Sequence, residues 1–200
     1  MVKRIVLDHC CGVIIDVQEF FLSQLDKPLR SRIETHTKNF AGLLGYLRIP
    51  LVVTLERPVE QKGSLPRAIS RRLSGNDSAQ TFEKDFFDLT REKQIRDHLK
   101  ALNKTQVIVA GCETDVCVLQ SCLGLRGLGY EVYVVEELVF SSSHNVDAAS
   151  ARMKAEGAIF LSYKSLYYEL FEAVGGSRYM EKIVERFGPF PEDLSDPTGQ

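Results

Sequence analysis

Several features are scarce in this chain, and each scarcity excludes a class of protein. The 200 residues include no tryptophan, three methionines, four histidines and five cysteines. No apolar run approaches the roughly 18 residues that a membrane-spanning helix needs. The 25 basic and 27 acidic residues leave a formal net charge of −2, without the basic excess that a nucleic-acid-binding surface requires. We therefore expect neither a membrane nor a nucleic acid as a partner.

The cysteines lack the spacing of a disulfide framework or a zinc site. Their number is odd, Cys10 and Cys11 are adjacent, and no C-x-x-C pair occurs, whereas such frameworks depend on regular spacing. The four histidines are scattered, and the amino-terminal segment turns acidic at Asp8, too early for a secretory signal. We expect reduced thiols in a cytoplasmic protein with no metal and no cofactor.

Short apolar runs that are typical of buried strands alternate with stretches that are typical of helices. Strands are predicted at 11–15, 51–55, 106–110, 131–135 and 158–161, and helices at 29–47, 90–102, 114–128, 145–156, 165–173 and 177–187. Residues 56–80 contain prolines and glycines and are predicted to form a long irregular connection. This alternation favours an α/β fold with three αβα layers and a mostly parallel, open, Rossmann-like sheet.

The chain shows neither an internal repeat nor a linker between domains. We expect one domain over residues 1–200, with a helical extension at about 165–187 and an irregular tail at 188–200. The extension carries an apolar stripe that one small domain does not bury easily, formed by Tyr167, Tyr168, Leu170 and Phe171. We therefore expect a homo-oligomer, dimeric or larger, although the stripe could instead pack onto the sheet of its own chain.

Open parallel sheets bind ligands beyond the carboxyl ends of their strands, and three reactive side chains are predicted at that edge. Asp16 follows the first strand, Lys84 comes just after the long connection, and Cys117 lies in the first turn of a helix beginning near Thr114. Unpaired N–H groups and the helix dipole favour a thiolate at that position. Together the three can supply a nucleophile, a base and a charge partner. The hypothesis requires a Cys117 pKa well below that of a free thiol.

Four segments resemble the isochorismatase-like cysteine hydrolase family, which includes nicotinamidases, N-carbamoylsarcosine-type amidohydrolases and ureidoacrylate amidohydrolases. Residues 13–21 are similar to its apolar strand followed by D-x-Q-x-x-F, residues 82–87 to its K-x-x-F/Y element, and residues 110–118 to its G-x-x-T-x-x-C-V turn. Residues 129–157 are similar to its closing strand and helix. The resemblance covers about 11–170, and its order and spacing are more specific than any single motif.

The resemblance implies catalytic roles for Asp16, Lys84 and Cys117. Cys117 attacks an amide-type carbonyl, Asp16 accepts the thiol proton and passes it to the leaving amine, and Lys84 holds the anionic groups in place. It also implies a cis peptide bond between Cys112 and Glu113, and an oxyanion hole formed by the backbone N–H groups of Glu113 and Cys117. Gln18, Cys112 and Thr114 are candidates for the substrate pocket.

Two departures from the family pattern narrow the expected reaction. The stretch after the second strand, 54–59, holds no histidine where nicotinamidases carry an Asp-x-His metal site, which disfavours a metal-dependent nicotinamidase. Isochorismatases that cleave a vinyl ether lack the nucleophilic cysteine, so Cys117 indicates a different reaction. The remaining pattern is most similar to the uncharacterised isochorismatase-domain hydrolases. The expected enzyme is a metal-independent cysteine hydrolase that cleaves a small amide or N-carbamoyl C–N bond through a thioester.

Two other functions stay open at this point. A non-catalytic binding or scaffold protein can retain the fold, in which case Asp16 or Lys84 should lie far from the Cys117 sulfur. A thiol redox sensor could use Cys112, Cys117 or Cys122, although the sequence offers no resolving C-x-x-C.

Overall fold

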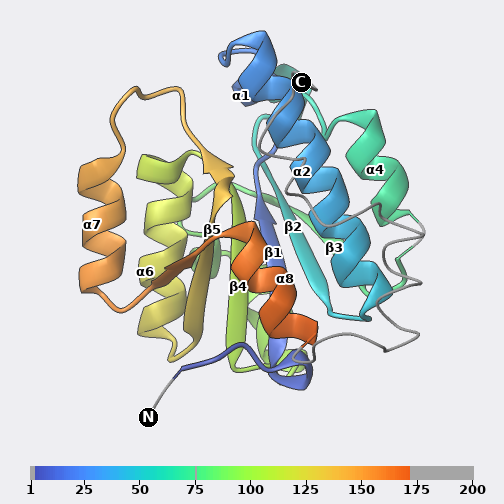
Figure 1. The fold of residues 1–200 in the computed structure, drawn as a ribbon. Helices are drawn as coiled ribbons and strands as arrows, with labels where there is room; N and C mark the ends of the chain where they lie inside the picture. The colour runs from blue at the N-terminus through green and yellow to red at the C-terminus, as the bar shows by residue number, and fades with distance from the viewer. Residues whose placement is uncertain (1–2, 75, 172–200) are drawn as a thin grey trace.

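The structure is a computed structural model that describes residues 3–74 and 76–171, and within these ranges six strands form one parallel sheet (Figure 1). The strands are β1 (Cys10–Ile15), β2 (Leu51–Glu56), β3 (Ala79–Lys84), β4 (Gln106–Cys112), β5 (Glu131–Phe140) and β6 (Ile159–Leu161). Their order across the sheet is β3-β2-β1-β4-β5-β6, and every adjacent pair is parallel. The predicted α/β class with a parallel open sheet is confirmed.

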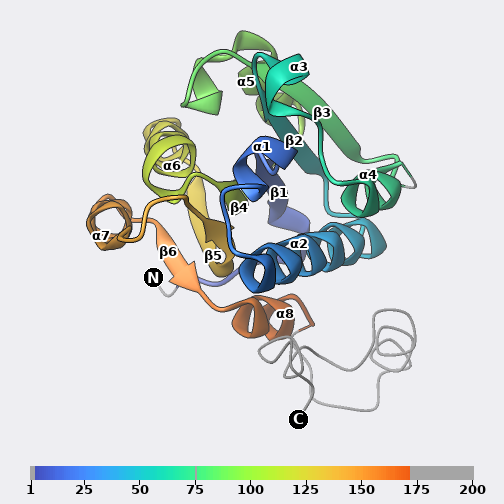
Figure 2. The same cartoon turned by 90° about the horizontal axis from the view of Figure 1, so that it is seen from above.

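Helices cover both faces of the sheet and complete three layers (Figures 1 and 2). One apolar cluster joins the sheet to α2 (Lys27–Tyr46), α4 (Arg67–Leu73) and α8 (Tyr163–Phe171). A second cluster joins the opposite face to α5 (Lys93–Ala101), α6 (Leu119–Gly127) and α7 (Asp147–Ala155). Because both faces are covered, β1 and β4 are buried at every position, which is why their sequences are apolar apart from Gln106 at the start of β4.

The strand order reverses between β1 and β4, which lie at the centre of the sheet. From β1 the chain builds outward to β2 and β3, and from β4 it builds outward on the other side to β5 and β6. Such a reversal opens a crevice beyond the carboxyl ends of the two central strands. The short helices α1 (Glu19–Leu22) and α3 (Val59–Lys62) follow β1 and β2 and contact each other beside this edge (Figure 2).

The predicted irregular connection at 56–80 is wrong in part. It contains α3 and α4, and its end enters β3, which pairs with β2 at the edge of the sheet. Gln80, Thr81 and Glu83 of β3 are exposed, whereas Phe82 and Lys84 are buried. At the edge of the sheet β3 is covered less completely than the inner strands, so it lacks the apolar run by which the inner strands were predicted.

Other boundaries shift by a few residues. The helix predicted at 114–128 is a π-helical turn, η3 (Thr114–Val118), followed by α6, and the helix predicted at 90–102 is a 3₁₀ turn, η2 (Leu89–Arg91), followed by α5. A further 3₁₀ turn, η1 (Leu7–His9), precedes β1. The expected helix at 177–187 and the tail at 188–200 lie outside the described residues. In the part of the chain that is described, no helix has the length and apolarity needed to cross a bilayer.

Gly111 is the position where the central strands leave no room for a side chain. Its φ is +121°, and a Cβ built there would lie 2.0 Å from the carbonyl oxygen of Ile15 on β1. We expect Gly111→Ala to destabilise the protein by about 3 kcal/mol or more, because it combines a strained φ with a clash against backbone. Urea denaturation measures this change in the free energy of unfolding.

Gly127 provides the matched control for that substitution. It lies in α6, and a Cβ added there has no heavy atom within 4 Å. Alanine is the better helix former, so Gly127→Ala should leave stability unchanged or raise it by up to about 1 kcal/mol. Equal effects of the two substitutions would contradict the close approach of β1 and β4.

Candidate active site at the carboxyl edge of the sheet

Asp16 leaves β1 in a conformation that turns its carboxyl group toward the neighbouring strands. Its φ is +50°, a left-handed conformation that aspartate tolerates better than most residues. The Asp16 N–H donates to the Thr54 carbonyl at 3.1 Å, and the Thr54 hydroxyl donates to Asp16 Oδ1 at 2.8 Å. Both residues are fully buried. The carboxylate is thus fixed by β2 rather than free to follow a ligand.

Lys84 brings an ammonium group into the same buried space. It is the last residue of β3 and is in register with Glu56, the last residue of β2, so the two side chains leave the sheet on the same face. Lys84 Nζ lies 2.6 Å from Asp16 Oδ2 and 3.5 Å from both Glu56 Oε2 and Cys117 Sγ. The side chain is completely buried, so its charge is compensated by these groups rather than by water.

Cys117 approaches this ammonium from the turn that follows β4. The turn begins at a cis peptide bond between Cys112 and Glu113, and the Glu113 carbonyl accepts hydrogen bonds from the N–H groups of Val116 and Val118. Cys117 Sγ lies 2.9 Å from Glu56 Oε2, and the thiol is 2% exposed. Asp16, Lys84 and Cys117 therefore lie together, and the separation expected of a scaffold that merely retains the fold is not found.

The expectation of a low Cys117 pKa is wrong for the structure described. Burial and the negative charge of Asp16 raise the pKa of the Cys117 thiol above its ordinary value, and Lys84 offsets only part of that rise. The hydrogen bond to the Glu56 carboxylate also favours the protonated thiol. Cys117 is consequently a protonated thiol in this structure.

The pKa values of the other three members of the cluster are shifted by the balance between burial and neighbouring charges. Burial alone would lower the pKa of Lys84, but the charges of Asp16, Cys117 and Glu56 outweigh it and the net shift is upward. Burial raises the pKa of Asp16 despite Lys84 and Thr54. For Glu56 the contacts with Cys117, Lys62 and Lys84 outweigh burial and lower the pKa.

Glu56 is the member of the cluster that the sequence reasoning missed. In addition to its contacts with Cys117 and Lys84, its second carboxylate oxygen, Oε1, pairs with the ammonium group of Lys62 on α3. The available signal was its position at the carboxyl end of a buried strand.

The three predicted pocket residues differ in what they contact. The Gln18 side chain accepts from the Glu56 N–H at 2.7 Å and donates to the carbonyls of Glu56 and Gly63 at 3.2 and 2.8 Å. Cys112 Sγ donates to the Asp16 carbonyl at 2.9 Å. Both side chains therefore brace the backbone of the cluster, whereas Thr114 is buried in the η3 turn. Their contact with substrate, and that of the Glu113 and Cys117 N–H groups, stays a prediction.

Three donors in the cluster are of a kind that holds metal ions. Single ligand atoms of Asp16, Glu56 and Cys117 lie within 4.8 Å of one another, and carboxylate and thiolate are both zinc ligands. However, Lys84 Nζ contacts all three groups at 2.6–3.5 Å. An ammonium group among the donors repels a second cation. The donor set fits an internal ammonium better than a metal ion.

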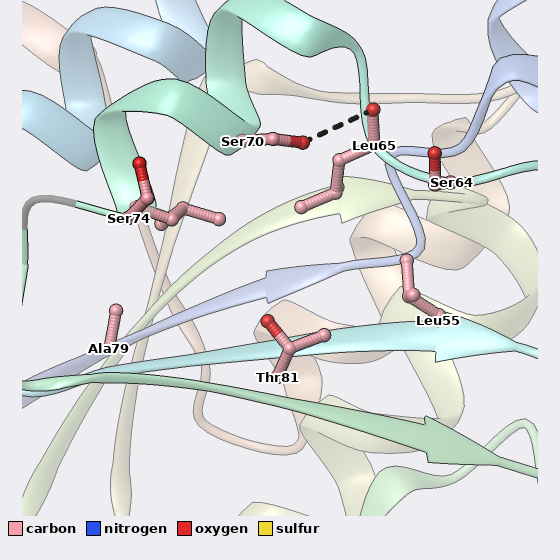
Figure 3. A pocket seen from close by; sticks show the side chains of 8 residues that line it. Leu55, Ser64, Leu65, Ser70, Ser74, Ala79 and Thr81 are labelled. Atoms are coloured by element: carbon pink, nitrogen blue, oxygen red, sulfur yellow. Dashed lines mark hydrogen bonds between the residues drawn. The ribbon is translucent and has the colours of Figure 1, made fainter.

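A separate hollow of ≈ 330 Å³ lies on the other face of β2 and β3, beneath α4 (Figure 3). Leu55 contributes to it, and its side chain alternates with those of Thr54 and Glu56, which face the cluster. The hollow therefore does not open on Cys117. Its lining residues are Leu55, Ser64, Leu65, Ser70, Leu73, Ser74, Ala79 and Thr81.

Thr54 supports the cluster through a single hydroxyl, which makes its contribution testable. Thr54→Val keeps the shape but removes the donor to Asp16 Oδ1, and we expect a loss of about 1–3 kcal/mol in the free energy of unfolding. Thr54→Ser keeps the hydroxyl and should recover most of that loss. Chemical denaturation of both variants provides the measurement, and equal stabilities would contradict the hydrogen bond.

The fold and the buried cluster define a class, namely three-layer α/β proteins with a cysteine-containing site at the switch point of a parallel sheet. Within that class, the family model described as the Isochorismatase domain matches residues 10–165. The chain belongs to the isochorismatase family, which confirms the resemblance drawn from the motifs.

Relatives from distant organisms extend this assignment. The secreted isochorismatase effector Isc1 of Phytophthora sojae is 31% identical over 180 residues, which cover 86% of this chain and 82% of Isc1. The MAR1 ribonuclease structure of Caenorhabditis elegans is 26% identical with a TM-score of 0.81, covering 92% of each chain. YcaC of Escherichia coli, described as an octameric hydrolase of unknown specificity, has a TM-score of 0.85 at 20% identity and covers 98% and 94% of the two chains. At 20% identity, the similarity to YcaC shows a shared fold and nothing more.

Proposed function

We propose that the protein is a metal-independent cysteine hydrolase that cleaves the C–N bond of a small amide or N-carbamoyl substrate. The observation that carries the proposal is the contact of the buried Lys84 ammonium with Asp16 Oδ2 at 2.6 Å and with Cys117 Sγ at 3.5 Å. A cysteine, a carboxylate and an ammonium in contact are the groups that a thiol nucleophile needs for activation and charge balance.

The proposed reaction has two stages, and each passes through a tetrahedral intermediate at the carbonyl carbon. The sulfur of Cys117 attacks the carbonyl carbon, the C–N bond breaks, the leaving nitrogen takes a proton, and a thioester forms. Water then attacks the thioester and regenerates the thiol. In the arrangement that the family resemblance implies, Asp16 carries the proton in both stages and Lys84 keeps the anionic groups in place. No cofactor takes part.

The backbone of the turn after β4 is proposed to stabilise the developing oxyanion. Its donors are the N–H groups of Glu113 and Cys117, and each such donor typically contributes about 10²–10³ in rate. The Glu113 carboxylate accepts from the N–H and the hydroxyl of Ser142 at 3.1 and 3.0 Å. These bonds hold the turn to the end of β5, as a preorganised oxyanion hole requires.

We also propose one domain over residues 1–200 that assembles as a homo-oligomer, dimeric or larger, in the cytoplasm. The octameric state given for YcaC supports assembly, as does the 50% exposure of Tyr168 on α8. Light scattering at micromolar concentration tests this, and a strict monomer near 22 kDa would remove the proposal.

The reaction is tested by a hydrolysis screen with wild type and Cys117→Ala. The substrates are simple amides, ureido acids and N-carbamoyl amines, with isochorismate as a C–O comparison and RNA as a further arm because MAR1 is named a ribonuclease. We expect release of amine or ammonia from at least one C–N substrate by wild type only. Turnover confined to isochorismate or RNA, or turnover that persists in the variant, would contradict the proposal.

A further inference from the structure

The two carboxyl groups beside Cys117, those of Asp16 and Glu56, have different hydrogen-bond partners. The oxygens of Asp16 are taken by the Thr54 hydroxyl at 2.8 Å and by the Lys84 ammonium at 2.6 Å. Glu56 instead places Oε2 2.9 Å from Cys117 Sγ, where the thiol donates its hydrogen bond. The proton that must leave the sulfur therefore already points at Glu56.

We propose that Glu56, rather than Asp16, accepts the proton of Cys117 during nucleophilic attack, and that Asp16 acts by orienting Lys84. This inference rests on the proposed cysteine hydrolase function. It assigns Glu56 a catalytic role that neither the family resemblance nor the comparisons give. A general base must lie within hydrogen-bond reach of the proton that it removes, and Glu56 meets this condition directly.

The backbone of Glu56 is held in a way that suits a residue with a fixed catalytic geometry. Gln18 bonds both to its N–H and to its carbonyl, so the strand end is pinned between β1 and α3. Pairing with Lys84 in register fixes the direction of the side chain. Glu56 is 8% exposed. A carboxylate restrained at backbone and side chain needs little reorganisation to accept the proton.

The charges around Glu56 leave it ionised while the thiol is protonated. Lys62 faces it from α3 and Lys84 from β3, while Cys117 lies opposite on η3. Asp16 after β1 and Cys112 at the end of β4 are the other titratable groups that sense its charge. Burial opposes ionisation of Glu56, but its contacts with Cys117, Lys62 and Lys84 outweigh burial and lower its pKa. Geometry decides between the two carboxyl groups, because Glu56 accepts the thiol hydrogen bond whereas the oxygens of Asp16 are engaged by Thr54 and Lys84.

The proposed step conserves atoms and charge within the cluster. The S–H bond breaks as Glu56 gains the proton, the sulfur lone pair forms the S–C bond, and the carbonyl π electrons move to oxygen. Collapse of that oxyanion expels the nitrogen, which takes the proton from Glu56 as the C–N bond breaks. The carboxylate is then ready to deprotonate the water that attacks the thioester. No oxidant or external proton carrier is required.

The pH dependence of Cys117 alkylation by iodoacetamide tests the assignment without a known substrate. In wild type, proton transfer to Glu56 forms the thiolate without proton loss to solvent, so the rate should be nearly constant over about two pH units around neutrality. In Glu56→Gln the proton must leave to solvent, and the rate should rise about tenfold per pH unit. Mass spectrometry of the peptide containing Cys117 follows the reaction.

Two further variants separate Glu56 from Asp16. Lys62→Met removes a cation that faces Glu56, and we expect the acid edge of the plateau to move upward by roughly 0.5–1 pH unit. Lys62 is partly exposed, so this variant tests the assignment even if Glu56→Gln does not fold. Asp16→Asn should retain the plateau. An unchanged profile in Glu56→Gln or Lys62→Met, or loss of the plateau in Asp16→Asn, overturns the assignment.

Hydrolysis of any substrate found in the screen distinguishes failure of this inference from failure of the function. Glu56→Gln should lower kcat by about 10²–10⁴-fold, and Glu56→Asp should recover part of that loss. If Cys117→Ala is inactive while Glu56→Gln retains the wild-type rate and pH profile, only the role of Glu56 fails. If Cys117→Ala remains active, the cysteine hydrolase itself is refuted.

Discussion

Replacing Cys117 by alanine is expected to lower kcat/KM for a C–N substrate by about 10⁴-fold or more. In the proposed reaction the sulfur forms the bond to the substrate carbon, and the water that remains in its absence lacks the thiol's nucleophilicity. The thiol is small and nearly buried, so the variant should still fold. Circular dichroism and chemical denaturation establish that the loss lies in chemistry rather than in structure.

Cys122→Ala is the matched control for that loss. Cys122 lies one turn further along, on α6, and is fully buried in the apolar cluster without a contact to Lys84 or Asp16 among those described. Its removal should cost about 1–2 kcal/mol of stability through the cavity left behind while kcat/KM stays within about twofold of wild type. If Cys122→Ala is as inactive as Cys117→Ala, the nucleophile has been assigned wrongly.

Lys84→Met is expected to be the most destabilising change in the site. It removes the cation that compensates Asp16 and Glu56 while filling similar volume, and breaking a buried ion pair in this way typically costs about 3–5 kcal/mol. Hydrolysis should also fall, because the anionic cluster then opposes formation of a thiolate. Urea denaturation at neutral pH measures the first effect, and kcat measures the second.

The contribution of the Lys84 ion pair to stability should depend on pH in a defined direction. The pKa of Lys84 in the folded protein lies above its ordinary value of 10.5, so the stabilisation is complete below pH 10.5 and is lost as pH rises through the folded pKa. Lys84→Met lacks this alkaline loss. The loss of stability in Lys84→Met relative to wild type should become smaller in acid, where Asp16 becomes neutral.

A surface pair provides the comparison for Lys84→Met. Lys93 Nζ lies 2.5 Å from Asp97, but the two side chains are 82% and 50% exposed. Lys93→Met should leave stability without a measurable change, because water already solvates both charges. Equal effects of the two substitutions would show that the Lys84 cluster is solvated rather than buried.

The inner strands could be predicted from the sequence because burial on both faces imposes apolar residues at successive positions. β3 could not, since Gln80, Thr81 and Glu83 are exposed on the edge strand and carry no apolar signal. Its pairing with β2 is nevertheless what places Lys84 beside Glu56. The strand with the weakest sequence signal, β3, therefore places the Lys84 ammonium group in the site.

For the site, the sequence identified residues better than it identified their electrostatics. Motif order brought Asp16, Lys84 and Cys117 into one hypothesis, and the structure brings them into contact. The direction of the Cys117 pKa shift depends on burial, on the charge of Asp16 and on the Glu56 contact, none of which a helix-start pattern contains. Register between strands, rather than composition, decides which carboxylate meets the thiol.

The central claim, that Cys117 is the reacting thiol of this cluster, is tested most directly by labelling with one equivalent of iodoacetamide. Cys117 is 2% exposed, whereas Cys10, Cys11, Cys112 and Cys122 are completely buried. The account predicts one carbamidomethyl group on Cys117 by peptide mass spectrometry, with hydrolytic activity lost in proportion to labelling. Preferential labelling of another cysteine, or full activity in protein labelled at Cys117, would contradict it.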